Sequence, residues 1–302
     1  MELMGITDEG ADSIAEQVKV TRDLGWKWIE ARNVQVDGFD KGCIHDIPDA
    51  AFDRVVEAIE GSGVGIYAFG STICNWAKTI DTPWKVTLDE VMRTIPRMKR
   101  LGTKYVRIMS FKPPDDTDRT SPVVFERIAE VTRMFLDEGL QPVHENCMNH
   151  GGMSWQHAVE LLEQVPGIKW VFDTGNPIFN SDRSKARPWP KQDPLEFWRH
   201  VKDHTAHIHI KDGVWNAEKN ETEFTFPGEG QGQVREILRD AFASGYDAGI
   251  SIEPHMTVVF HDAASEAKDQ DMYDNYMEYG RRMMRLIDEV KAELKEAAPA
   301  TG

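Results

Sequence analysis

The sequence predicts a single (β/α)8 barrel. Eight short apolar runs alternate with longer amphipathic segments, and many of these segments end in glycine shortly before the next run. Alternating strands and helices imply a parallel sheet, and eight such units are the number that closes a barrel. An open, doubly wound sheet is the alternative. The first strand, however, runs into TDEGADSIAEQ, which lacks the glycine-rich turn usual in that fold. We expect a barrel domain over residues 1–294 and a disordered tail over 295–302.

The elements follow one another regularly along the chain. The eight predicted strands are residues 3–9, 26–34, 64–71, 104–111, 141–147, 168–176, 205–212 and 248–255. Helical periodicity follows the first four strands, in SIAEQVKVTRDLG, AFDRVVEAIEGSG, VMRTIPRMKRLG and FERIAEVTRMFLDEG. Glycines that can close a helix stand at positions 25, 63, 102, 139, 167 and 245. Four longer segments are expected to be loops at the barrel mouth, namely 72–85, 177–193, 213–232 and 256–272.

Charge and composition restrict the class of protein. The 35 Lys and Arg residues against 51 Asp and Glu give a net charge of −16, which disfavours a nucleic acid as partner. We find no apolar run of membrane-spanning length and no basic-then-apolar start, so we expect neither a membrane association nor a secretory signal. Cys43, Cys74 and Cys147 are odd in number and widely spaced, which favours a reduced, cytoplasmic protein.

Ionisable residues stand near the ends of the last four predicted strands. Strand five ends at Glu145 in VHENC, strand six at Asp173 in FDTGN, and strand eight at Glu253 in SIEPH, while strand seven carries His209 in HIHIKD. Functional groups of such barrels cluster at the carboxyl ends of the strands. Three carboxylates and an imidazole form a mixed oxygen and nitrogen ligand set for a divalent ion. One acid at a strand end is more often a solvated residue or a helix cap, so the prediction depends on all four.

The motifs HEN, FDTGN, HIHIKD and SIEPH, in this order, resemble the sugar phosphate isomerase/epimerase family of the xylose isomerase-like TIM barrel superfamily. The resemblance covers residues 1–292. It implies one divalent ion, expected to be manganese with magnesium, cobalt or zinc as alternatives, held by Glu145, Asp173, His209 and Glu253. It also implies isomerisation or epimerisation of a keto sugar or related polyol, with Glu145 and Glu253 as the proton-transferring pair. The second histidine of the His-x-His strand is usually the ligand, which leaves His207 as a hydrogen-bonded core residue or a further site residue.

Other residues are candidates for contacting the substrate. Lys211 lies one pleat nearer the mouth than His209, where it can hold a substrate oxygen or pair with a carboxylate. Asn176 matches a position that contacts substrate in relatives, although ketose 3-epimerases commonly have histidine there. The remaining candidates are His144, which can instead point outward to a helix, together with His150, Trp76 and Arg107.

Further features of the loops leave alternatives open. Trp76, Trp84, Trp189 and Trp215 are expected near the opening, where an aromatic face suits a sugar or an aglycone ring and also suits simple lid packing. The segment FPGEGQGQ (226–233) can cradle a phosphate or form an ordinary turn, and the turn is favoured because a phosphate-loop lysine and serine are missing.

Two other enzyme classes compete with the isomerase. A lyase on the same site, such as a 3-keto C-glycoside deglycosidase or an inosose-type dehydratase, would remove the same proton and expel a neighbouring group. A DNA repair enzyme of the endonuclease IV type would need three metals and more histidines than YAFGST, RIMSF and DTGN contain. We therefore expect a small-molecule sugar as partner, with no nucleic acid and no membrane, and leave a homo-oligomer open.

Overall fold

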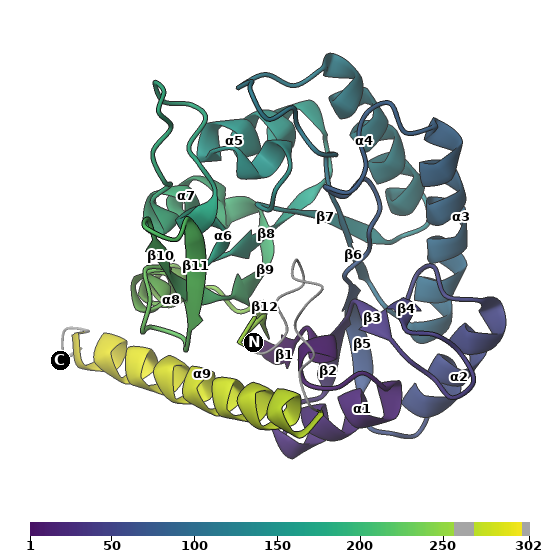
Figure 1. Cartoon of the computed structure of the whole chain (residues 1–302). Coiled ribbons are helices and arrows are strands. Elements are labelled where there is room, and N and C mark those ends of the chain that lie inside the picture. Colours follow the sequence, from purple (N-terminus) through teal and green to yellow (C-terminus); the bar gives the residue numbers. More distant parts are fainter. Residues whose placement is uncertain (257–268, 298–302) are drawn as a thin grey trace.

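The protein, described by a computed structural model over residues 1–256 and 269–297, is the expected (β/α)8 barrel (Figure 1). Eight parallel strands form one sheet in the order β1-β12-β9-β8-β7-β6-β5-β2, and a parallel bridge between Ile6 and Glu30 joins its two ends. The strands are β1 (Glu2–Gly5), β2 (Trp28–Ala31), β5 (Gly65–Phe69), β6 (Tyr105–Ile108), β7 (Gln141–Glu145), β8 (Lys169–Asp173), β9 (Thr205–Ile210) and β12 (Gly249–Ile252). Each overlaps its predicted run, so the sequence pattern identified all eight strands of the barrel.

Helices surround the barrel (Figure 1). They are α1 (Ile14–Asp23), α2 (Asp49–Ile59), α3 (Trp84–Leu101), α4 (Pro122–Leu136), α5 (Trp155–Gln164), α7 (Pro194–Val201), α8 (Val234–Ala243) and α9 (Asp269–Ala297), with a short α6 (Asn176–Phe179). Single 3-10 turns lie at Thr7–Glu9, His150–Gly152 and Lys202–His204. Over the described residues, we find no helix with the length and apolar character needed to cross a membrane. Helix α9 continues three residues past the predicted domain boundary at residue 294, and residues 298–302 of the predicted tail lie outside the described part, as do residues 257–268 of the predicted loop 256–272.

The barrel interior changes from apolar to charged along the strands. Residues two positions apart on a strand share a face. Val143 on β7 and Val171 on β8 form a small buried cluster, and each lies two residues before an acid, Glu145 or Asp173. The apolar layer therefore supports the lower side of a polar layer at the carboxyl ends of the strands, which is where barrels of this type carry their functional groups.

The segment predicted as a loop over 213–232 contains an antiparallel hairpin instead. Strands β10 (Asp212–Asn216) and β11 (Glu221–Thr225) pair with each other beside the barrel mouth. They are followed by the glycine-rich turn, whose backbone is held by one side chain. The carboxylate of Asp212 accepts hydrogen bonds from the N–H groups of four glycines, at 2.9, 2.8, 3.0 and 2.8 Å for Gly213, Gly228, Gly230 and Gly232. These donors are thus engaged by the protein itself, so FPGEGQGQ is the ordinary turn rather than a phosphate cradle.

Replacing Asp212 by alanine is expected to destabilise the fold by about 2–4 kcal/mol, because buried N–H groups lose their acceptor. The stability of Asp212→Asn should lie between those of Asp212→Ala and the parent, since the amide oxygen of asparagine can still accept hydrogen bonds from the glycine N–H groups. Denaturant unfolding of the two variants and the parent measures the effect. A loss below about 0.5 kcal/mol for Asp212→Ala would show that water replaces the carboxylate.

Candidate metal centre

Four side chains from neighbouring strands converge at the mouth of the barrel. Glu145 ends β7, Asp173 ends β8, His209 lies on β9, and Glu253 directly follows β12. All four are buried, and one ligand atom of each lies within 4.8 Å of the others. Ions with ligand distances of about 2.0–2.6 Å place their ligands at most about 4–5 Å apart, so the spacing suits a single cation. The structure therefore brings together the four residues that the sequence singled out.

The imidazole of His209 is held with one nitrogen turned into the cluster. Nε2 lies 2.9 Å from the Glu30 carboxylate, while Nδ1 lies 3.7 Å from both Glu145 Oε1 and Glu253 Oε2. Burial opposes ionisation of Glu30, yet His209 and His207 lower the pKa of this carboxyl well below its usual range, so Nε2 donates to a carboxylate. Nδ1 has no hydrogen-bond partner among the described residues. The carboxylate of Glu30 thus holds the proton on Nε2 and leaves Nδ1 facing the cluster. This is the arrangement of a histidine that binds a metal through one ring nitrogen.

The two carboxylate oxygens of Asp173 have different roles, one in capping a helix and the other in the cluster. Oδ1 accepts from the backbone N–H groups of Gly175 and Asn176 at 2.8 and 2.7 Å, so it caps the start of α6. Oδ2 faces the cluster, where it forms an ion pair with Lys211 Nζ at 3.1 Å. Burial and the repulsion of two glutamates raise the pKa of Asp173 to about 7, against the opposing effect of Lys211. The helix-cap and ligand interpretations of this residue are therefore compatible, because they use different oxygens.

The two glutamates are held by cations. Arg107 Nη1 donates to Glu145 Oε2 at 2.6 Å, and Arg32 Nη1 donates to Glu253 Oε1 at 3.0 Å. Burial alone would raise the pKa of Glu145, but Arg107 and then His209 outweigh it and bring the value down to about 2. The pKa of Glu253 is likewise well below its usual range, because Lys211 and other cations outweigh burial. Both glutamates are thus ionised before any metal is considered.

Lys211 lies among the carboxylates of the cluster and also lines a small cavity beside it. Its ammonium is 3.0 Å from Glu253 Oε2 and 3.1 Å from Asp173 Oδ2, and the side chain is buried. Although burial acts against the charge, these carboxylates raise the pKa of Lys211. The structure thus shows the carboxylate pairing that the sequence left as an alternative to substrate contact. A positive charge in this position neutralises part of the negative charge of the cluster.

Strand β2 and the residue directly after it supply two site residues that the sequence analysis missed. Glu30 fixes His209, and Arg32 bridges Glu253 to Asp8 and Glu9, with Nε 3.0 Å from Asp8 Oδ2 and Nη2 3.0 Å from Glu9 Oε1. The signal was present in WIEAR, because Glu30 and Arg32 stand two apart among apolar residues and so share one face of the chain. A third missed residue, Asn146 of the HEN motif, ties β7 to β8 by exchanging two hydrogen bonds with the backbone of Asp173.

The remaining candidates for substrate contact divide into two groups. Asn176, Trp76 and Arg107 line a small inner cavity of about 40 Å³ beside the cluster, and Asn176 Nδ2 donates to Glu145 Oε1 at 3.0 Å. His144 and His150 line neither this cavity nor the larger outer one. His144 points away from the barrel interior and stacks on Trp170 with ring centroids 5.0 Å apart, while His150 lies 2.7 Å from Thr120 Oγ1. The structure does not bring these two histidines to the cluster.

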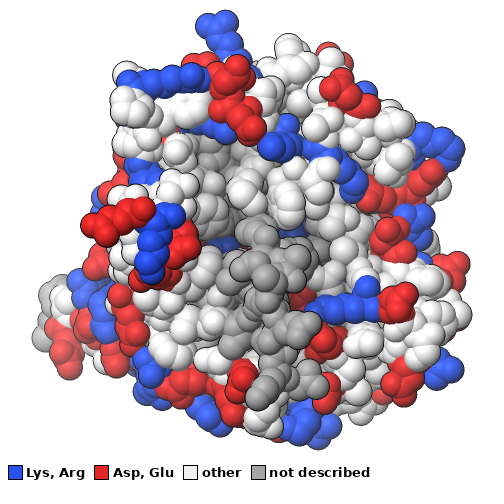
Figure 2. All heavy atoms as spheres, in the orientation of Figure 1, with Lys and Arg blue, Asp and Glu red and all other residues white. Residues whose placement is uncertain are grey.

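An outer cavity of about 970 Å³ opens above the inner one. Trp76 and Cys147 line both cavities, so the two cavities are adjacent at these residues. Figure 2 shows the face at which the barrel opens, hollowed near its centre and carrying interspersed basic and acidic side chains. Trp189 lines the outer cavity as expected, whereas Trp84 and Trp215 do not. Trp84 donates to Glu130 on α4, and Trp215 lies under Lys191.

The fold and the site define a class of protein, namely a (β/α)8 barrel with a buried carboxylate and histidine cluster at the carboxyl ends of its last four strands. The model of the xylose isomerase-like TIM barrel family matches residues 18–290, and the chain belongs to this family. Comparison with curated protein sequences gave no match.

Solved structures share the fold at low sequence identity. One is a xylose isomerase-like TIM barrel protein from Mycobacterium smegmatis in complex with magnesium, at 15% identity and a TM-score of 0.67 over 96% of this chain and 97% of that one. L-ribulose 3-epimerase is 15% identical over 100% of both chains with a TM-score of 0.67. The probable 3-DHS dehydratase AsbF from Bacillus anthracis is 14% identical over 94% of this chain and 99% of that one with a TM-score of 0.65. These similarities establish the fold. The reaction has to be inferred from the residues of the site.

The two histidines of β9 should respond differently to truncation. His209→Ala is expected to abolish binding of a divalent metal, because a ligand that faces the cluster is lost. His207→Ala should retain the metal and lower the free energy of unfolding by about 1–3 kcal/mol through a cavity and a lost polar contact with Glu30. Metal analysis and thermal melting of both variants decide the point. The opposite pattern would mean that the ligand is His207.

Glu30→Gln is expected to weaken metal binding about 10- to 100-fold while leaving every ligand in place. The amide can still accept from His209 but carries no charge, so the imidazole becomes a poorer donor to the ion. Competition titration against a chelating dye gives the affinity, and a melting curve checks the fold. Parental affinity in a folded Glu30→Gln variant would remove this carboxylate from the metal centre.

Metal uptake should release protons. Burial disfavours the charged imidazole of His209, but Glu30 and the other carboxylates raise its pKa well above the usual value, and the pKa of Asp173 is about 7. Both groups therefore carry protons near neutral pH that an incoming cation must displace, so the apparent affinity should rise from about pH 6 to about pH 8. Calorimetry in buffers of different ionisation enthalpy counts the released protons. An affinity that is constant over this range would contradict a protonated His209.

Proposed function

We propose that the protein is a divalent-metal-dependent isomerase or epimerase of a keto sugar or related polyol, acting by proton transfer beside a carbonyl. The observation that carries this proposal is the convergence of Glu145, Asp173, Glu253 and His209 in one buried cluster, with His209 Nδ1 left without a hydrogen bond by the described residues. Three oxygen donors and one nitrogen, without thiolate, suit Mn²⁺ or Mg²⁺ and also admit Co²⁺ or Zn²⁺. A cation held there would polarise a substrate carbonyl and acidify the adjacent C–H bond.

The two glutamates are arranged to work from opposite sides. Strands β7 and β12 are three places apart in the ring of eight, with β8 and β9 between them. Glu145 and Glu253 consequently approach the space above the cluster from different directions. One carboxylate can take a proton from one face of a carbon, and the other can return a proton to the opposite face, which inverts that carbon. Asn176 and Arg107 keep Glu145 oriented, and Arg32 does the same for Glu253.

The low pKa values of these glutamates restrict the substrate. A carboxylate with a pKa of about 2 is a weak base, so it abstracts a carbon-bound proton only if that proton is itself strongly acidified. A carbonyl beside the carbon, polarised by a cation, supplies that acidity. The proposal therefore names a keto sugar, or a polyol with one carbonyl, rather than a fully reduced polyol.

A lyase on the same site is the second candidate, and the position of Lys211 favours it. Its ammonium lies 3.0 Å from Glu253, beside the proposed proton acceptor. After the proton is removed, this ammonium can donate a hydrogen bond to a negatively charged group leaving the next carbon, so that the same first step would lead to an elimination. The names of two structural relatives, an epimerase and a dehydratase, are in keeping with either outcome.

Solvent exchange tests the function directly. The metal-loaded protein should exchange a carbon-bound proton beside the carbonyl of a keto sugar for deuterium from D2O, and product analysis should then separate an epimer from an eliminated product. Free ketoses, inososes and 3-keto glycosides form the substrate panel. Absence of exchange with all of them, in protein shown to contain metal, would refute proton transfer as the activity.

Glu145→Gln and Glu253→Gln should each lower the exchange rate by about 100-fold or more, because each loses a proton-transferring group. Loss of metal alone could have the same effect, so metal content is measured for each variant and the rate is compared at full occupancy. A fully loaded variant that exchanges at nearly the parental rate would exclude that glutamate from proton transfer.

A further inference from the structure

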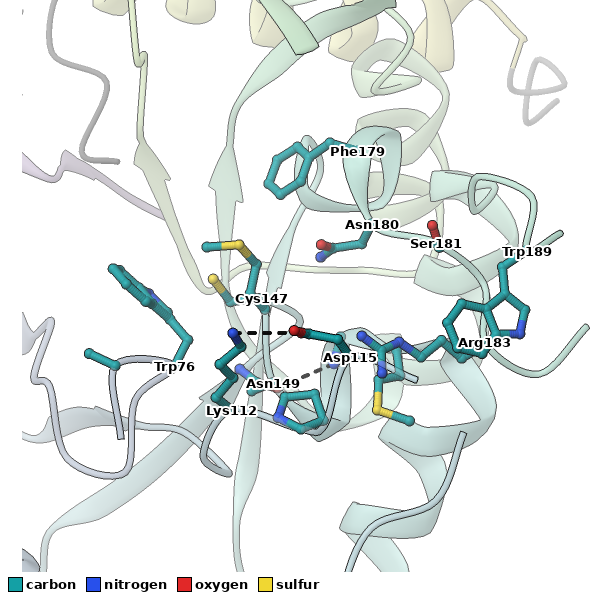
Figure 3. A pocket seen from close by; sticks show the side chains of 15 residues that line it. Trp76, Lys112, Asp115, Cys147, Asn149, Phe179, Asn180, Ser181, Arg183 and Trp189 are labelled. Atoms are coloured by element: carbon teal, nitrogen blue, oxygen red, sulfur yellow. Dashed lines mark hydrogen bonds and ion pairs between the residues drawn. The ribbon is translucent and has the colours of Figure 1, made fainter. Parts of the chain in front are cut away.

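The outer cavity is built from the segments that follow four successive barrel strands. Trp76 follows β5, Lys112 and Asp115 follow β6, Asn149 follows β7, and Trp189 lies in the segment after β8. In Figure 3, Trp76 and Trp189 stand on opposite sides of the space, with Phe179 above it. Two methionines, Met148 and Met153, also line the cavity. Most of its large side chains are thus aromatic or sulfur-containing.

Several polar groups in this wall are already engaged with the protein, whereas Asn180 Nδ2 has no hydrogen-bond partner among the described residues. Arg183 Nη1 donates to the carbonyls of Pro114 and Thr117 at 2.6 and 2.8 Å, and its guanidinium lies 5.0 Å from the Trp189 ring centroid. Lys112 pairs with Asp115 at 3.6 Å. The Asn149 amide donates to Glu145 O at 3.1 Å and accepts from Gly152 N at 3.2 Å. A sugar ring needs many hydrogen-bond partners, whereas these groups leave mainly apolar faces for a ligand.

The sizes of the two cavities differ greatly. The inner cavity, about 40 Å³, has room for the few atoms that approach the cluster. The outer cavity, about 970 Å³, is near the upper end of the range of about 300–1,000 Å³ that is typical of pockets for drug-sized molecules. A free pentose or hexose would leave most of that space filled by water against aromatic walls. The pair of cavities fits a ligand with a small polar end and a large apolar end.

We infer that the substrate is a glycoside with an aromatic aglycone, whose keto-sugar part lies at the cluster and whose aglycone lies in the outer cavity. This inference rests on the proposed function for the sugar end of the ligand. Trp76 and Cys147 line both cavities, so the inference places the glycosidic link beside these two residues. An anomeric carbon that carries an aglycone has no free carbonyl, so the ketone must stand on another carbon of the ring. Trp76, Phe179 and Trp189 offer the planar faces that stack on an aromatic ring.

The first measurement is a comparison of matched substrates. The phenyl and methyl glycosides of the same 3-keto sugar differ only in the aglycone, and the metal-loaded protein is assayed for deuterium exchange with each. Burying one phenyl ring should raise kcat/KM about 10- to 100-fold over the methyl glycoside. Equal values for the two glycosides would overturn the inference while leaving the proposed function intact. Absence of exchange with either would count against the proposed function instead.

The second measurement is independent of turnover. Calorimetric titration of the metal-free and the metal-loaded protein with the non-oxidised phenyl and methyl glucosides should show preferential binding of the phenyl compound in both forms. Trp189→Ala and Phe179→Ala should bring the phenyl-to-methyl ratio close to one. Trp155→Ala is the matched control, because this indole stacks on His200 with ring centroids 3.6 Å apart and lines neither cavity. Melting curves confirm that each variant is folded, and an unchanged ratio in folded Trp189→Ala and Phe179→Ala would refute the aglycone site.

Discussion

Compensation of buried charge is the constraint on which this site depends. Glu145, Asp173 and Glu253 would repel one another strongly in a space from which water is excluded, and the barrel balances them with Arg107, Lys211 and Arg32. Burying an unpaired charge costs several kcal/mol, so removing one partner of an ion pair leaves the other as an uncompensated buried charge. The charges therefore hold each other in place, and the carboxylates gain fixed orientations that loops at the surface could not give them.

The closed barrel is what makes this arrangement possible. Ladder pairing places Asp173 beside His209 and Ser251 beside His209, so the heights of residues on β8, β9 and β12 are fixed relative to one another. Side chains two residues below the acids are apolar and buried on β7 and β8, so the cluster rests there on an apolar layer. The glycine-rich turn around Asp212 then anchors the hairpin directly after β9. Rigid strands thus orient the acids, while the segments beyond them shape the larger cavity.

The sequence predicted those parts of the molecule that repeat. The eight strands, the barrel and the four converging residues followed from local periodicity and from corresponding positions in successive units. It did not reveal Glu30 or Arg32, because their partners lie on strands about 180 to 220 residues away and only the closed ring brings them together. The sequence also left open which way the side chain of His144 points, since a shift of one residue in strand register turns a side chain from the barrel interior toward a helix. The β10–β11 hairpin has short, polar strands, and such strands carry little hydrophobic pattern.

Lys211 gives the cluster a positive charge of its own. A zinc finger unfolds without its ion because metal binding supplies most of its folding free energy. Here an ammonium already lies between two of the acids, and two guanidinium groups hold the glutamates. These ion pairs belong to the chain itself, so we infer that the barrel folds without the ion that we propose for it. The supply of metal would then set how much of the folded protein is active.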